Sequence, residues 1–317
     1  MKHRYQGLII FLNRRCTVGC PSCNAKALPG NREELSSRWL SAFFPSVKNV
    51  KFPGFILWTG GEPFLSFEAL QAGISIASGR GYHSEILTSG IWFDAHPQWL
   101  EPLAEKGNVS IRISLDAEHR EKVPLPMVIA LIRKALALQI EVNFTLRDIP
   151  GRQGFVDRCI GEIKKHLPEF YRRNRSRSRW LHYIPHIPVS PEPSSPCVSQ
   201  TQKYRQPCRI IFRDLVIGED GLVYPCCGLL GFPFHQQLAV GNPMEESWET
   251  LVSRQKSHPL FRVLKEKGPY GICRKLGLEP GKWEWPSFQS PCHLCMALFS
   301  EEGETLIHQS FLQEKVL

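Results

Sequence analysis

The chain has 317 residues, which predicts two domains or one large α/β unit and excludes a short peptide module. Apolar residues make up 42% and charged residues 22%, so the chain is expected to fold, and no apolar run reaches the roughly 18 residues of a membrane span. The run at 8–12 is too short for a signal peptide, so we expect a cytoplasmic protein with no membrane partner. Lys and Arg outnumber Asp and Glu by 39 to 30, but no nucleic-acid-binding motif accompanies this charge, and we expect no nucleic-acid partner.

The first 188 residues alternate short apolar runs with longer amphipathic stretches, the pattern of repeated βα units around a parallel sheet. Strands are predicted at 7–12, 55–58, 83–88, 109–115, 141–146 and 181–187. Helices are predicted near 32–46, 66–78, 97–106, 124–139 and 153–166. Six strands rather than eight predict an α/β fold of the open kind, a partial (β/α)6 barrel over residues 1–188.

Beyond the fifth predicted helix, arginine alternates with Asn and Ser at 172–179 without apolar periodicity. This pattern indicates an exposed basic loop, which is either plainly solvated or a surface that steers an acidic partner. Pro and Ser dominate 188–196 and predict a linker to a smaller domain over 189–317. That domain is predicted to hold a β-hairpin, 210–217 and 222–224 around a turn at 218–221, and helices near 245–267 and 297–313.

Eleven cysteines in a chain without an export signal favour a reducing compartment and metal or cluster ligation. Three of them form a C-x3-C-x2-C motif directly after the first predicted strand, Cys16, Cys20 and Cys23. Their spacing also fits one face of a helix, but Gly19 and Pro21 disfavour a helix here. Three thiolates in a loop can hold a four-iron cluster and leave one iron open. Tetrahedral zinc is the alternative, although it needs a fourth close ligand and no further His or Cys occurs before residue 83.

A second motif follows the second predicted strand and consists of Gly60, Gly61, Glu62 and Pro63. Two glycines let a backbone approach a ligand closely, and a carboxylate can accept charge-assisted hydrogen bonds from an ammonium group. The cysteine motif followed by this segment resembles the pattern of the radical SAM superfamily. Members of that superfamily bind a four-iron cluster through three cysteines after the first strand of a partial barrel. The resemblance covers about residues 7–188.

The resemblance implies roles for residues at the ends of the predicted strands. Residues 60–63 would hold the amino group of S-adenosylmethionine (AdoMet). Ser89 and Ser114 match positions that contact the ribose or the methionine carboxylate. Arg147 matches a position that can hold this carboxylate, but a surface arginine fits the sequence equally well. Ser22 stands where the family usually has an aromatic residue.

The second region holds seven further cysteines, Cys197, Cys208, Cys226, Cys227, Cys273, Cys292 and Cys295. Their placement resembles the auxiliary-cluster extension of radical SAM enzymes, in the short form called Twitch rather than the longer SPASM form. The resemblance implies one auxiliary [4Fe-4S] cluster, held by the four thiolates of Cys208, Cys226, Cys292 and Cys295. Zinc bound by the same four residues is the alternative. Cys227 could replace its neighbour, Cys197 and Cys273 stay unassigned, and Cys159 is predicted to be a core residue.

The implied activity is reductive cleavage of AdoMet at a [4Fe-4S] cluster to a 5′-deoxyadenosyl radical, which abstracts a substrate hydrogen. An external donor such as flavodoxin or ferredoxin would supply the electron, and the auxiliary cluster would transfer electrons. The basic stretch favours a ribosomally made peptide as substrate. Because the first strand starts by residue 7 and leaves no room for an N-terminal peptide-recognition domain, dehydrogenation of a carbohydrate-like small molecule is the alternative. A cluster-bearing electron-transfer protein without catalysis is disfavoured by residues 60–63.

Overall fold

The computed structural model describes residues 5–50, 54–147, 149, 151–152, 154–175, 181–183, 205–231, 235–278, 291–299 and 307. The predicted domain boundary at 188/189 and Cys197 lie outside these residues. None of the helices in these ranges is both long and apolar enough to cross a membrane.

One sheet organises the fold, and its strands run in the order β6-β5-β4-β3-β2-β1-β7-β8. The strands are β1 (Leu8–Asn13), β2 (Phe55–Gly60), β3 (His83–Thr88), β4 (Val109–Leu115), β5 (Glu141–Leu146), β6 (Leu181–Tyr183), β7 (Leu215–Ile217) and β8 (Val223–Tyr224). Every neighbouring pair is parallel except β7 with β8. The predicted partial barrel is confirmed, because the six strands β1 to β6 run parallel in a sheet that is not closed.

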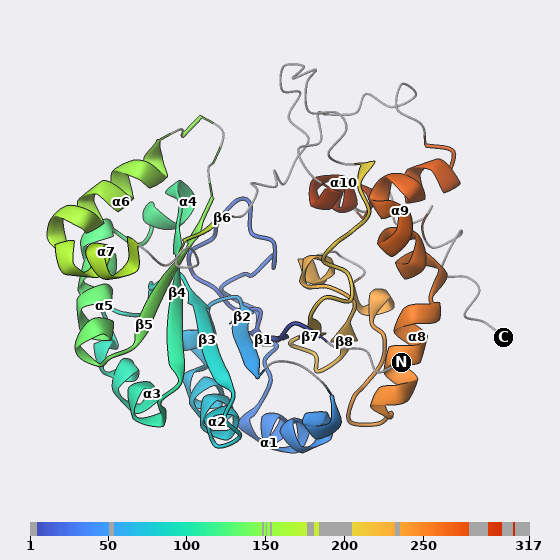
Figure 1. The fold of residues 1–317 in the computed structure, drawn as a ribbon, viewed down its shortest axis with the longest axis horizontal. Coiled ribbons are helices and arrows are strands. Elements are labelled where there is room, and N and C mark those ends of the chain that lie inside the picture. The colour runs from blue at the N-terminus through green and yellow to red at the C-terminus, as the bar shows by residue number, and fades with distance from the viewer. Residues whose placement is uncertain are drawn as a thin grey trace.

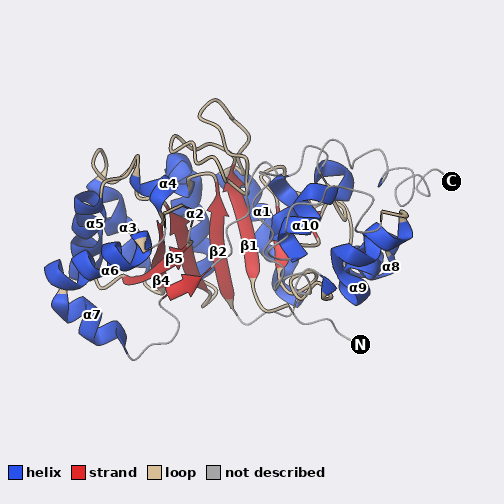
Figure 2. Ribbon diagram, turned by 90° about the horizontal axis from the view of Figure 1, so that it is seen from above, coloured by secondary structure: helices blue, strands red, loops and turns tan. Residues whose placement is uncertain are grey.

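Helices cover the outer face of this sheet, and Figure 1 shows α1, α2, α3, α5, α6 and α7 as an arc outside β1 to β5, with α4 at the ends of the strands. They are α1 (Ser37–Ser46), α2 (Phe67–Ser78), α3 (Leu100–Lys106), α4 (Ala117–Arg120), α5 (Leu125–Ala137), α6 (Phe155–His166) and α7 (Pro168–Arg175). In the view of Figure 2, α8 (Trp248–Ser257), α9 (Pro259–Lys275) and α10 (Pro291–Leu298) lie beyond β1, on the other side of the molecule from α5. Short 3-10 turns include η2 (Pro63–Ser66) and η5 (Cys227–Gly231).

The second region joins the sheet of the first, because β7 pairs in parallel with β1 through Leu8 with Leu215 and Ile10 with Ile217. Its hairpin therefore extends the barrel sheet on the far side of β1. The sequence predicted the hairpin but not this pairing.

Two sequence predictions in the helices are corrected by the structure. Residues 172–175 of the basic stretch 172–179 are helical and end α7, so this part is not a loop. Phe170 of the same helix is buried and packs edge-on against Phe144 of β5. The last predicted helix, 297–313, falls mostly outside the described residues, and the helix that the structure shows, α10, begins earlier.

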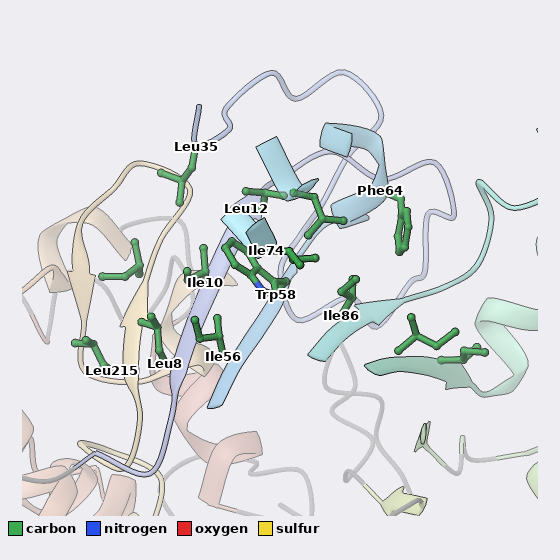
Figure 3. Close-up of a cluster of buried hydrophobic side chains, with 14 of the residues drawn as sticks. Leu8, Ile10, Leu12, Leu35, Ile56, Trp58, Phe64, Ile74, Ile86 and Leu215 are labelled. Carbon is green, nitrogen blue, oxygen red and sulfur yellow. The ribbon is translucent and has the colours of Figure 1, made fainter. Parts of the chain in front are cut away.

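The main core lies between the sheet and its helices. Figure 3 shows Ile10, Trp58 and Ile86 on this face, and all three are fully buried. Trp58 packs against α2 at Gly73, where a Cβ atom would come within 2.4 Å of the indole ring. A smaller apolar cluster, which includes Ile9, covers the opposite, inner face of β1 and β7. With apolar side chains packed on both of its faces, β1 is held firmly and fixes the loop at its carboxyl end.

Candidate functional site

The loop after β1 carries the cysteine motif, and its backbone is irregular rather than helical. Gly19 has a φ of +69°, a conformation that glycine adopts without strain. The Cys23 amide donates to the Cys20 carbonyl over 3.2 Å, and the Cys16 amide donates to the Leu28 carbonyl over 3.4 Å. The sequence prediction of a non-helical loop is thus confirmed.

The three thiols of this loop are partly exposed. Burial raises the pKa of Cys16 to about 11, and the charges of Glu62 and Cys23 add to the effect. Burial likewise raises the pKa of Cys20, with contributions from Asp116 and Cys23. Because metal ligation needs thiolates, a cationic centre between them would offset this repulsion. The donor set therefore fits an iron–sulfur cluster with three protein ligands.

The Gly-Gly-Glu segment at the end of β2 is pinned against the start of the cysteine loop. The Gly61 amide donates to the Asn13 carbonyl over 2.8 Å, and the Glu62 amide donates to the Arg15 carbonyl over 2.7 Å. A Cβ atom on Gly60 would lie 2.2 Å from the oxygen of Asn13, and one on Gly61 would lie 2.1 Å from the oxygen of Arg15. The sequence argument assigned these glycines to a ligand, whereas the structure shows that they first allow β2 to approach the loop.

The Glu62 side chain joins the ends of β2 and β3. Oε1 accepts from Thr88 Oγ1 (2.7 Å) and the Phe64 amide (3.4 Å), and Oε2 accepts from the Ser89 amide (2.9 Å) and Ser89 Oγ (2.6 Å). Burial raises the pKa of Glu62, and these four donors act against the rise. They use the acceptor sites of the carboxylate, so a direct bond to the AdoMet ammonium requires one of them to open.

Arg147 fastens the cysteine loop to the ends of β4 and β5. Its Nη1 donates to the Ser22 carbonyl (3.0 Å), and its Nη2 lies 3.2 Å from Asp116 and 3.1 Å from Glu118. Ser22 Oγ donates to the same Glu118 carboxylate over 2.6 Å. Arg147 is 5% exposed, so the alternative of a surface arginine is wrong. Its guanidinium already faces two carboxylates, and a cofactor carboxylate would have to share it.

Arg120 of α4 is a site residue that the sequence argument missed. Its Nη2 donates to the carbonyls of Ser89 (3.0 Å) and Ser114 (2.8 Å). Its Nε and Nη1 are buried and have no hydrogen-bond partner among the described residues. Burial lowers the pKa of Arg120 to about 10, against the charges of Asp116, Cys159 and Cys20. The only signal in the sequence was an arginine just after a strand whose end was already assigned to the site.

The second group of thiols comes from the segments before β7 and after β8 and from α10. Cys208 is fixed by its amide, which donates to the Leu264 carbonyl of α9 over 3.0 Å. Burial raises the pKa of Cys295 well above its ordinary value, and the charges of Cys226, Cys208, Cys292 and Cys273 add to this. Burial also raises the pKa of Cys292 to about 11, with Cys208 and Cys227 contributing. The structure thus brings together the four predicted ligands.

Cys273, which was left unassigned, and Cys227, the predicted possible substitute for Cys226, lie beside these four. Cys273 of α9 is fully buried, and Cys227 packs against the inner-face cluster. Within the described residues, no three His, Cys, Asp or Glu side chains converge closely enough to share one metal ion. A four-iron cluster takes each of its thiolates on a separate iron. Cys159 is buried in α6, where it was expected.

The sheet is open and parallel, three thiols follow its first strand, and a second group of thiols lies near its hairpin. This arrangement defines a class of iron–sulfur enzyme. Residues 10–166 match the Radical SAM superfamily, and residues 208–275 match SPASM, an iron–sulfur cluster-binding domain. The chain therefore belongs to the radical SAM superfamily and carries a SPASM-type domain. Its cofactors are AdoMet, a [4Fe-4S] cluster and auxiliary iron–sulfur. The SPASM match includes Cys208 and Cys226 and ends before Cys292.

Similar proteins agree with this assignment. "Putative peptide biosynthesis protein YydG" of Bacillus subtilis (strain 168) is 20% identical over 307 residues, 92% of this chain and 91% of that protein. Native anSMEcpe with bound AdoMet has a TM-score of 0.60 at 14% identity and covers 96% of this chain and 98% of its own. BtrN in complex with AdoMet and 2-DOIA has a TM-score of 0.50 at 16% identity, over 84% of this chain and 89% of its own. At these identities, the solved structures show the shared fold.

Proposed function

We propose that the protein cleaves AdoMet reductively and modifies a ribosomally made peptide by hydrogen-atom abstraction. The observation that carries this proposal is the contact between the cysteine loop and the Gly-Gly-Glu segment, through Asn13 with Gly61 and Arg15 with Glu62. It places three thiols and a buried carboxylate at the same ends of neighbouring strands, where parallel barrels hold their active sites. When bound, the cluster and AdoMet supply a 5′-deoxyadenosyl radical that takes a hydrogen atom from the substrate.

In this proposal the chain's own residues bind and orient. Cys16, Cys20 and Cys23 are the three ligands of the loop cluster, and Glu62 and Ser89 form the polar floor beside it. Ser114 and Arg147, with Arg120, line the ends of β4 and β5, where a cofactor carboxylate would find guanidinium donors. Cys208, Cys226, Cys292 and Cys295 hold one auxiliary cluster for electron transfer.

Two comparisons support a peptide substrate. The relative YydG is named for peptide biosynthesis. One structure of anSMEcpe contains AdoMet and the Cp18Cys peptide, with a TM-score of 0.56 at 14% identity. Arg172 and Arg173 are exposed on α7 and would attract an acidic peptide segment. We further propose a flavodoxin or ferredoxin as electron donor and the cytoplasm as location, because free thiols and clusters need a reducing compartment.

Radical modification of a carbohydrate-like small molecule, such as dehydrogenation, is the second candidate. Its support is the likeness to BtrN, whose structure contains 2-DOIA together with AdoMet.

The cleavage step is tested with anaerobically reconstituted, reduced protein, by measuring 5′-deoxyadenosine and methionine. We expect both products from the wild type and none above background from the variant with Cys16, Cys20 and Cys23 all changed to Ala. Cys159→Ala is the matched control, because this thiol lies in the core of α6, and it should keep the activity. Undiminished product from the triple variant would refute the assignment of the loop.

The substrate class is tested by isotope transfer. A short peptide encoded next to the gene is synthesised with deuterated residues and incubated with AdoMet and the reduced enzyme. Deuterium in 5′-deoxyadenosine identifies the peptide as hydrogen donor. Transfer from deuterated amino sugars, with none from any such peptide, would favour the second candidate.

A further inference from the structure

Arg14 connects the cysteine loop to the second region. It follows β1 and stands two residues before Cys16, and its own backbone is fixed by the amide of Leu28, which donates to its carbonyl over 3.2 Å. Its side chain leaves the loop: Nε lies 2.8 Å from Glu219 Oε1, and Nη2 donates to the Leu230 carbonyl. Glu219 lies in the turn between β7 and β8, and Leu230 belongs to η5, which starts right after Cys226. The guanidinium of Arg14 therefore contacts one residue before Cys226 in the chain and one residue after it.

Glu219 depends on this arginine. Its side chain is 1% exposed, and neither carboxylate oxygen has an aligned hydrogen-bond donor among the described residues. The imidazole of His235 is farther away, with Nε2 at 4.0 Å from Oε1. The neighbouring Asp220 differs, because it accepts from the Leu222 amide and from the Tyr224 hydroxyl within its own turn. A buried carboxylate without donors is held by opposite charge, and here that charge belongs to the cysteine loop.

A second contact joins the same two segments. Asn24, the residue after Cys23, approaches Gly231 so closely that a Cβ on this glycine would lie 1.8 Å from the Asn24 carbonyl oxygen. Gly231 ends η5. The segments that flank the two thiol groups are thus in backbone contact at one point and ion-paired at another.

We propose that the Arg14–Glu219 ion pair, together with the bond from Arg14 to Leu230, is a positioning bridge that fixes the loop cluster relative to the auxiliary cluster. The inference rests on the proposed cluster assignments and adds a role for two residues that ligate nothing. Because the bridge crosses between the segments, a change at Glu219 reaches the cysteine loop, although it lies far from it in sequence.

The test is Glu219→Gln in the reconstituted protein, followed by amide hydrogen exchange. Removing one charge from a buried pair is strongly destabilising locally, so residues 14–28 and 218–231 should both exchange about tenfold faster, while α5 stays unchanged. The electron paramagnetic resonance spectrum of the reduced loop cluster should also change, although none of its ligands is altered. Glu121→Gln is the control, because it breaks an exposed pair with Arg152 and should affect neither segment.

Arg14→Lys is the second variant, for the case that Glu219→Gln does not fold, because it keeps the charge and loses the bond to Leu230. It should loosen 14–28 and 226–231. Faster amide exchange confined to 218–231 in Glu219→Gln, or unchanged amide exchange of η5 in Arg14→Lys, would contradict the proposed bridge. Iron analysis of the same samples separates the two claims: wild-type protein that takes up no iron contradicts the proposed function, whereas loaded protein whose two segments respond independently contradicts the bridge.

Discussion

Asp116 shows how one residue serves local structure and the site together. Its side chain caps α4 by accepting from the His119 amide over 3.1 Å, and it also contacts His119 Nδ1 (2.9 Å) and Arg147 (3.2 Å). Burial raises the pKa of Asp116, but His119 and Arg147 outweigh this and lower it to about 2. Loss of this carboxylate charge would weaken the hold of Arg147 on the cysteine loop.

The pH dependence of stability tests this residue. Because the folded-state pKa of Asp116 lies below its ordinary value of 3.8, its contribution is complete above about pH 4 and is lost as the pH falls towards 2. The contribution is on the order of 2 kcal/mol. The difference in unfolding free energy between wild type and Asp116→Asn should therefore shrink between pH 4 and pH 2 in urea titrations. A constant difference for Asp116→Asn across this range would contradict the assignment.

At the scale of elements, the strands of the first region were predicted well from the sequence, but the ends of some elements were not. The ranges 83–88, 109–115 and 141–146 coincide with β3, β4 and β5, because apolar β-branched runs stop there at polar residues. The first helix was predicted from residue 32 but begins at Ser37, because Ser36 caps it and Glu34 bridges to Asn13. The short helix α7 had no apolar stripe to reveal it.

The sequence indicated both thiol groups of the candidate site but not the residues that support them. Cysteine spacing is a local signal, and it pointed to both groups; their roles as ligands stay predictions. The contacts that hold them, from Arg147 to Ser22 and from Arg14 to Glu219, join residues far apart in the chain. No local pattern records such pairs. The same holds for Arg120, whose role depends on two carbonyls at the ends of β3 and β4.

The approach of β2 to the cysteine loop gives a prediction at this scale. In Gly61→Ala, the new Cβ would lie 2.1 Å from the Arg15 carbonyl, so the backbone must move. We expect a loss of roughly 1–3 kcal/mol in unfolding free energy and weaker AdoMet binding. Gly161→Ala on α6 has no neighbour within 4 Å and should instead stabilise by about 0.5–1 kcal/mol. Equal urea midpoints for the two variants would show that the close approach is not required.

For the whole molecule, the two thiol groups predict its metal content. Iron should be about eight per chain, and the Cys16, Cys20 and Cys23 triple Ala variant should keep about half. Cys208→Ala should lose the other half and, once folded, still cleave AdoMet without turning over substrate. If the second group bound zinc instead, the triple variant would contain no iron and about one zinc per chain. Full substrate turnover and undiminished iron in Cys208→Ala would contradict its assignment as a ligand.

The shared sheet predicts that the regions are not separable. Leu8 and Ile10 of β1 are fully buried and pair with β7. A protein ending at residue 188 would expose this apolar strand as an open sheet edge. We expect aggregates or misfolded protein from this truncation in light scattering, against a defined species from the full chain. A monodisperse, folded truncation would contradict this expectation.

The pairing of β1 with β7 also sets an order of events during synthesis. The strand that leads into the cysteine loop is among the first made, but one of its two neighbours leaves the ribosome only after Ile217 has been added. Contacts of such long range form late, and until then β1 presents an unsatisfied edge to other nascent chains. The bridge from Arg14 to Glu219 closes later still. The edge of β1 that faces β7 is therefore covered only after the second region has been made.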